Sequence, residues 1–271
     1  MIADFGPFTQ SAIRNPQSAM TLSLTAVPHI PDVQPGDNAA ELILAALAEA
    51  RMTLQDGDVL AIAQKIISKA EGRLVLLADV VPGPRALEVA AQTDKDPRIV
   101  ELILRESDEI SRLKPGVLVV RHKLGFTSAN AGIDRSNVNT EGDTAVLLLP
   151  LDPDASAAAI RQTIQARLGV TVGVVITDSH GRPFRLGTVG VAIGVAGLPA
   201  LWDRRGEPDR YGYILQHTDV AVADEIAAAA GLLMGQAAEG LPVVVVHGLH
   251  LPPADGRATD LVRPKELDLY R

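Results

Sequence analysis

Two short turns carry the side chains of this sequence that are best suited to bind a metal ion. Asp134 and Asn137 lie in the first turn. Asp178 and Ser179 lie in the second. Carboxylate, hydroxyl and amide oxygens are ligands that Mg²⁺ and Mn²⁺ prefer, and these ions usually complete their coordination with substrate phosphates. The two turns therefore predict a site for a divalent metal and a phosphate-bearing substrate.

Each turn also has a simpler structural interpretation. Asp134 and Asn137 are three residues apart, so one helical turn would bring both to the same side. Alternatively, Asp134 caps a short helix and Asn137 closes a turn. Asp178 and Ser179 follow a strand, where such residues are ordinary turn formers. The presence of two such turns in one chain favours a site.

A third polar segment, at 64–73, follows a hydrophobic strand and contains Lys65, Lys69 and Arg73 together with an acid and a glycine. These cations could bind phosphates. The alternative is a charged, solvated segment at the end of the strand.

Missing motifs narrow the chemistry. The sequence has no Gly-x-x-x-x-Gly-Lys-Ser/Thr, and the glycines between 187 and 197 do not form Gly-x-Gly-x-x-Gly, so neither a P-loop nor the main dinucleotide fingerprint is present. No His-Glu-x-x-His occurs among the six histidines, which disfavours a zinc enzyme. There is no cysteine, which excludes disulfides and cysteine nucleophiles.

Bulk composition points to an enzyme acting on small molecules. With 271 residues and 47% hydrophobic composition, the chain can bury a large core as one domain or as two closely packed lobes. The net charge of −8 and the lack of a long basic stretch weigh against nucleic-acid binding. The first residues do not resemble a signal peptide, and no apolar run reaches the roughly twenty residues that cross a bilayer. A cytoplasmic location with no membrane partner is expected.

The hydrophobic pattern alternates between helical and extended spacing, which predicts an α/β (α+β) fold with no break that marks independent domains. A helix begins at an Asp152 cap and ends at Gly169, and the strand that follows leads directly to Asp178. The glycines at 187–198 predict close packing against another backbone. Strands are expected at 21–27, 59–63, 117–120, 145–149, 172–176 and 243–246, and further helices at 38–51, 84–91, 98–111 and, with an acidic N-terminal cap, 219–235.

Four segments, at 63–73, 131–138, 176–183 and 220–226, together resemble the coenzyme F420-0:L-glutamate ligase family and occur in that family's order. The resemblance extends over residues 21–271 and leaves 1–20 as an N-terminal extension that we expect to be disordered. It implies a two-lobed α/β fold that forms an intertwined homodimer and differs from Rossmann, P-loop and ATP-grasp folds.

The resemblance also implies an activity. Members of the family use GTP and Mg²⁺ or Mn²⁺, with K⁺ as a helper ion, to attach L-glutamate to F420-0 and then to add γ-linked glutamates. The expected intermediate is an acyl phosphate, and the products include GDP and phosphate. Two rival functions stay open: a metal-dependent phosphatase or phosphodiesterase, and a GTP-binding regulator without turnover.

Site residues follow from the same resemblance, position by position. Lys69, Asp134 and Asp178 would be catalytic, and Gln64 stands where some members have serine. The implied metal ligands are Asp134, Asp178, Ser179 and Asp219, and the implied nucleotide contacts are Val27, Pro28, His29, Ile30, Gln64, Lys65, Lys69, Asn137 and Gln216.

Overall fold

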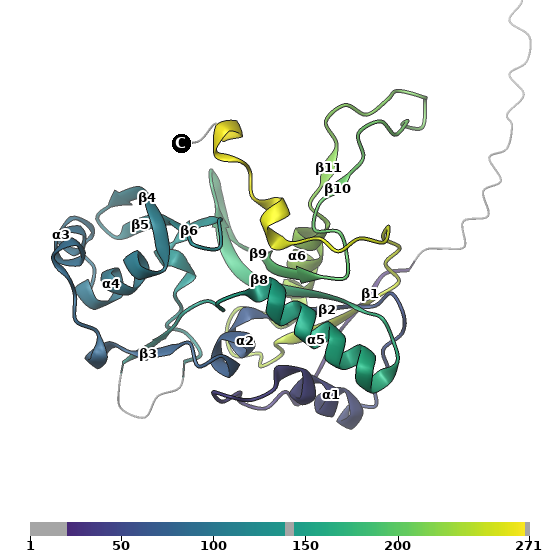
Figure 1. The fold of residues 1–271 in the computed structure, drawn as a ribbon, viewed down its shortest axis with the longest axis horizontal. Coiled ribbons are helices and arrows are strands. Elements are labelled where there is room, and N and C mark those ends of the chain that lie inside the picture. The colour runs from purple at the N-terminus through teal and green to yellow at the C-terminus, as the bar shows by residue number, and fades with distance from the viewer. Residues whose placement is uncertain (1–20, 139–143, 269–271) are drawn as a thin grey trace, which may run out of the picture.

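A five-stranded mixed sheet forms the centre of the structure (Figure 1). The computed structural model describes residues 21–138 and 144–268, so the extension predicted at 1–20 lies outside the described residues. In spatial order the strands are β1 (Ser23–Ala26), β12 (Val243–His247), β2 (Val59–Ala63), β8 (Gly173–Arg182) and β9 (Arg185–Ala196).

Helices cover both faces of this sheet because its strands alternate buried side chains between two cores. Val243 and Val245 of β12 belong to one apolar cluster, together with side chains of the helices α1, α2 and α5. Val244 and Val246 belong to the other, which α6 closes. Successive side chains of a strand point to opposite faces, so one apolar strand supplies both cores. The helices are α1 (Ala39–Glu49), α2 (Gln64–Ala70), α5 (Pro153–Leu168) and α6 (Val222–Met234).

Strands β2 and β8 run parallel, but β8 continues past the end of β2 to Arg182, so the turn predicted at Asp178 and Ser179 is wrong and both residues lie within this strand. The last paired residues of the two strands are Ala63 and Thr177. Helix α2 starts at the next residue after β2, Gln64, and Asp178 is the next residue in β8. The pairing therefore brings the first turn of α2 next to Asp178.

A smaller α/β part lies beside the sheet and has its own apolar clusters (Figure 1). The chain enters it through β3, which pairs with β7, the strand through which it returns. Within this part are β3 (Leu74–Leu76), η1 (Leu77–Asp79), α3 (Pro84–Thr93), α4 (Pro97–Arg105), β4 (Ser107–Lys114), β5 (Val117–His122), β6 (Thr127–Ala129), η2 (Asn130–Gly132) and β7 (Ala145–Leu147).

The remaining elements lie after β9. A hairpin made by β10 and β11 projects from the body of the molecule, and two short helical turns precede the C-terminus (Figure 1). These elements are β10 (Trp202–Asp203), β11 (Asp219–Val220), η3 (Ala258–Leu261) and η4 (Lys265–Leu267).

The helix predicted at 98–111 is wrong at its C-terminal end. Helix α4 stops at Arg105, and Ser107–Lys114 is strand β4, paired with β5. The cause is the two-residue connection between β4 and β5, which consists of a proline followed by Gly116, and Gly116 has φ +79°. That combination suits a tight turn between strands, whereas proline disrupts a helix.

The helix predicted at 219–235 also begins too early. Asp219 pairs with Asp203 in the β10–β11 hairpin, and α6 starts at Val222. Its N-cap, Ala221, has no side chain able to cap, so the predicted acidic cap is wrong. Acids nevertheless lie in the first turn of the helix, where the helix dipole favours them.

The close backbone packing predicted for the glycines of 187–198 is confirmed at Gly190 and Gly194. A Cβ atom on Gly194 would lie 2.5 Å from the carbonyl oxygen of Pro153 at the start of α5. A Cβ atom on Gly190 would collide with the carbonyl oxygen of Ala227 in α6. Only glycine lets β9 approach both helices this closely.

The mixed α/β class is confirmed. Within the described residues, β2 and β8 are the single parallel strand pair, which differs from the mostly parallel sheet of a Rossmann fold. No helix in the described part of the chain is both long and apolar enough to cross a membrane.

Replacing Gly194 by valine tests the packing of β9 against α5. We expect the free energy of unfolding to fall by about 1–3 kcal/mol, because the added atoms force the two backbones apart. Urea denaturation followed by circular dichroism measures the change. Gly181→Ala is the matched control, since a Cβ atom there meets nothing within 4 Å. Equal stability of the two variants would contradict the packing argument.

Candidate active site

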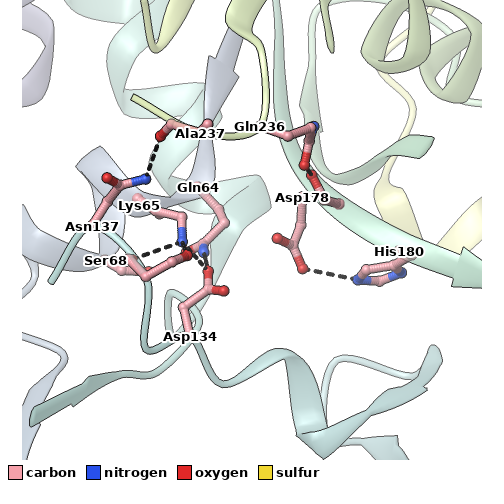
Figure 2. A network of polar contacts seen from close by, with 11 residues as sticks. Gln64, Lys65, Ser68, Asp134, Asn137, Asp178, His180, Gln236 and Ala237 are labelled. Carbon is pink, nitrogen blue, oxygen red and sulfur yellow. Dashed lines mark hydrogen bonds and ion pairs between the residues drawn. The ribbon is translucent and has the colours of Figure 1, made fainter. Parts of the chain in front are cut away.

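A cavity of about 610 Å³ opens where the end of β2 and the middle of β8 meet the smaller part of the structure and the loop after α6. The lining includes the carboxylates of Asp134 and Asp178, which Figure 2 shows directed into the same space. Of the residues predicted from the sequence, the cavity is lined by Ile30, Gln64, Lys65, Lys69, Asp134, Asn137, Asp178 and Ser179.

The backbone of Asp134 is fixed by two hydrogen bonds to Leu147 of β7. Its N–H donates to the Leu147 carbonyl at 3.0 Å, and its carbonyl accepts from the Leu147 N–H at 2.8 Å. Asp134 is therefore extended, and neither of the helical interpretations of its turn is right. Asn137 does lie in a turn, at φ +56°, and its amide donates to the carbonyl of Ala237 at 2.9 Å.

The carboxylate of Asp134 is held by two neighbours in the first turn of α2 (Figure 2). Gln64 Nε2 donates to it at 2.9 Å, and Lys65 Nζ forms an ion pair with it at 2.7 Å. Ser68, one turn along α2, donates its hydroxyl to Gln64 Oε1 at 2.7 Å. Both ends of the buried Gln64 amide are thus used within the protein, which makes Gln64 a support for Asp134.

Burial raises the pKa of the Asp134 carboxyl above its ordinary value of 3.8, and the negative charge of Asp178 raises it further. The ammonium of Lys65 and the amide of Gln64 oppose this shift and only partly offset it. Two carboxylates that share a partly buried space attract a cation, because a cation relieves both the desolvation and the mutual repulsion.

Asp178 is oriented by a histidine that the sequence analysis did not single out. The Nε2–H of His180 donates to the Asp178 carboxylate at 2.9 Å. The His180 ring packs against Phe126, with centroids 4.9 Å apart, and Phe126 stacks on His122 at 5.3 Å. Burial lowers the pKa of His122 to about 4, so this ring is neutral at pH 7. The stack limits the positions that His180 can adopt.

The cavity contains two more polar contacts. Lys69 forms an ion pair with Asp32 at 2.6 Å. Ser179 Oγ donates to Gln236 Oε1 at 2.8 Å. Asp32 and Gln236 were not predicted. Gln236 belongs to the cavity-lining loop between α6 and β12, which begins at Gly235 and includes Gly240, both at positive φ. This pair of glycines is the sequence signal that indicates the loop.

Some predicted residues lie away from the cavity. Val27 is fully buried, and its N–H donates to the carbonyl of Val243 in β12. Nδ1 of His29 lies 4.0 Å from Oε1 of Glu49 in α1. Of the predicted residues between 27 and 30, Ile30 alone lines the cavity, and Pro28 lies outside the lining. Gln216 and Asp219 belong to the β10–β11 hairpin and its connection, outside the cavity lining. Their roles stay predictions.

The oxygen donors at the site suit a hard divalent cation. Asp134 and Asp178 contribute carboxylates and Ser179 contributes a hydroxyl. Within the ranges that the structure describes, no three His, Asp or Glu side chains form a group able to hold a metal alone. Such a small protein ligand set fits Mg²⁺ or Mn²⁺, which bind with water and substrate phosphates as further ligands.

A sequence model of the family described as F420-0:Gamma-glutamyl ligase matches residues 28–248. The chain belongs to this family. The proteins named coenzyme F420:L-glutamate ligase from Methanothermobacter thermautotrophicus and Methanopyrus kandleri are 50% and 47% identical to it, each over 93% of the chain and over 100% and 98% of their own length. The protein of the same name from Methanocaldococcus jannaschii is 44% identical over 86% of the chain and 90% of its own length.

Family membership makes the chain an enzyme, a ligase that forms carbon–nitrogen bonds. The resemblance seen in the sequence is thereby confirmed. The polar cavity brings together acids, cations and amides from five separate segments of the family match.

The raised pKa of Asp134 predicts that Asp134→Asn stabilises the metal-free protein at pH 7. A carboxyl with a raised pKa in the folded state binds its proton more tightly there than in the unfolded chain. The charged form therefore costs stability at pH 7, and the cost disappears as the pH falls through the folded-state pKa to below 3.8. We expect the variant to unfold at higher temperature at pH 7 and to match the wild type near pH 3.

Thermal unfolding in the presence of a chelator measures this difference. The control is Asp96→Asn, because the hydrogen bond from Arg98 lowers the pKa of the Asp96 carboxyl. Its charged form stabilises the fold, so this variant should lose stability at pH 7. A loss of stability in Asp134→Asn at pH 7 would contradict the conclusion that the charged carboxyl of Asp134 destabilises the metal-free protein.

Proposed function

We propose that the chain is a GTP- and divalent-metal-dependent ligase that attaches L-glutamate to coenzyme F420-0 and then adds further γ-linked glutamates. The observation that carries the proposal is the pair of facing carboxylates, Asp134 and Asp178, in a cavity that also contains Lys65 and Lys69. The names of the relatives agree with the amide-forming reaction.

An amide cannot form efficiently from a free carboxylate, because a carboxylate is a poor electrophile. In the proposed reaction an oxygen of the acceptor carboxylate bonds to the γ-phosphorus of GTP while the bond to the GDP oxygen breaks. The amine of glutamate then attacks the carbonyl carbon of the acyl phosphate, phosphate leaves, and the amine loses a proton to solvent. GDP and phosphate are released once per amide bond.

The cavity residues contribute charge and position. Lys69 and Lys65 neutralise the nucleotide phosphates, and Asn137 contacts the nucleotide. Asp134, Asp178 and Ser179 would hold Mg²⁺ or Mn²⁺, which supplies charge stabilisation to the phosphates when bound. Phosphoryl transfer needs little covalent help from protein, so positioning and electrostatics supply most of the rate gain. K⁺ is a further proposed helper ion.

The proposal includes an intertwined homodimer. Support comes from the projecting β10–β11 hairpin, whose connection exposes Tyr211 and Tyr213 to solvent. Large exposed aromatic side chains are typical of protein–protein interfaces. In a dimer this hairpin could bring Gln216 and Asp219 to the cavity of the other copy.

Mass spectrometry of the products tests the reaction. The chain is mixed with F420-0, L-glutamate, GTP and Mn²⁺, and we expect F420-0 carrying one or more glutamates together with equal amounts of GDP and phosphate per amide. Phosphate release without an amide would favour the phosphatase or phosphodiesterase. GTP binding without any product would favour the regulator.

Replacing Asp134 by asparagine should reduce substrate-dependent GDP release by at least about a hundredfold, because the cation loses one of its two carboxylate ligands. Quantifying GDP by chromatography measures the effect. Asp94→Asn is the control, since Asp94 is exposed at the end of α3 in a left-handed conformation that asparagine also adopts. Turnover retained in Asp134→Asn would contradict the role of this carboxylate.

A further inference from the structure

The cavity has two chemically different ends. At one end Lys69 pairs with Asp32, and Lys65 lies one turn earlier in α2. At the other end the lining is formed by uncharged residues of β9 and α6, among them Gly231 and Met234. Asp178 lies between the two ends, because its strand β8 lies between β2, which leads into α2, and β9.

Gly231 is a helical residue that packing inside the chain does not explain. It lies in the third turn of α6, and a Cβ atom built on it meets nothing within 4 Å. Glycine in a helix costs about 1 kcal/mol relative to alanine, so alanine should be preferred unless something else needs the space. Gly190 differs, because its Cβ would collide with the carbonyl oxygen of Ala227.

The contact of Gly190 with Ala227 lies one helical turn from Gly231 along α6. Ala227 precedes Gly231 by four residues, so both lie on the face of α6 that is directed toward β9. At Ala227 the strand and the helix touch; at Gly231, where the cavity begins, no neighbour lies within 4 Å of a Cβ. Gly190 pairs with Ser179 in the sheet, so this opening adjoins the residue next to Asp178.

The geometry of phosphoryl transfer assigns an occupant to the opening. The attacking and leaving oxygens lie roughly in line on opposite sides of the transferred phosphorus. With the nucleotide phosphates against Lys65 and Lys69, the attacking carboxylate must arrive from the end that contains no cation. We propose that the end of the cavity bordered by Gly190, Gly231 and Met234 binds the carboxylic-acid acceptor, and that Gly231 sets the size of acceptor that fits.

This inference rests on the proposed function and adds to it the position of the acceptor. It makes Gly231 a determinant of specificity with no role in the fold. A side chain at 231 should exclude the acceptor while leaving the cationic end, and therefore the nucleotide, undisturbed. Alanine at this position should also favour the helix.

Steady-state kinetics of Gly231→Ala and Gly231→Leu, with F420-0, GTP and Mn²⁺ each varied in turn, tests the assignment. We expect Gly231→Leu to raise the KM for F420-0 roughly tenfold or more, with the KM for GTP unchanged. Gly231→Ala should show a smaller effect in the same direction. In urea, the unfolding midpoint of Gly231→Ala should not fall below that of the wild type.

Leu232→Phe is the matched control, because Leu232 is the next residue of α6, is 85% exposed and does not line the cavity. It should leave both KM values unchanged. An unchanged KM for F420-0 in Gly231→Leu, or a rise in the KM for GTP instead, overturns the acceptor assignment. A lower unfolding midpoint in Gly231→Ala shows a packing role and overturns it as well. Failure of the wild-type chain to form amide and GDP overturns the proposed function, and this inference with it.

Discussion

The parallel pairing of β2 with β8 is the constraint on which the site depends. It aligns Ala63 with Thr177, so the next residues, Gln64 at the start of α2 and Asp178 in β8, lie side by side. Helix α2 then presents Lys65 and Lys69 from one side. The smaller part of the structure leaves and returns through the β3–β7 pair, and the bridge from Leu147 to Asp134 returns the second acid to the same place. Residues distant in sequence meet because β2 ends, and α2 begins, beside a strand that continues past it.

The electrostatics of the site follow from this arrangement. The carboxyl of Asp134 lies in a partly buried position that raises its pKa, and its supports come from a single helical turn. Because Ser68 donates to the oxygen of the Gln64 amide, the nitrogen is the end of this amide that faces Asp134. Asp178 receives comparable support from His180 and the aromatic stack behind it. Both carboxylates are therefore oriented before any ligand binds, which would lower the free-energy cost of binding the proposed metal–nucleotide complex.

Local patterns allowed much of this to be predicted. The apolar strands, the capped helix that ends at Gly169 and the glycine-mediated packing of β9 depend on near neighbours, and the sequence indicates them directly. Strand β4 was missed because its residues also fit helical spacing until the following turn is considered. Asp32 and Gln236 matter through partners that only the tertiary fold brings near. His180 was missed for another reason: Asp178 was expected in a turn, whereas in β8 the two residues are two apart and lie on the same face. Metal binding and nucleotide contacts stay predictions.

The two acids belong to different parts of the molecule, and this has a consequence for motion. Asp178 is carried by the central sheet, whereas Asp134 is fixed to β7 at the edge of the smaller part. A hinge rotation of one part against the other would change the gap between the carboxylates. A ligand that bridges both acids would then favour the closed form. By thermodynamic linkage, any contact that favours the open form would weaken the binding of that ligand, and the coupling free energy is the same in both directions.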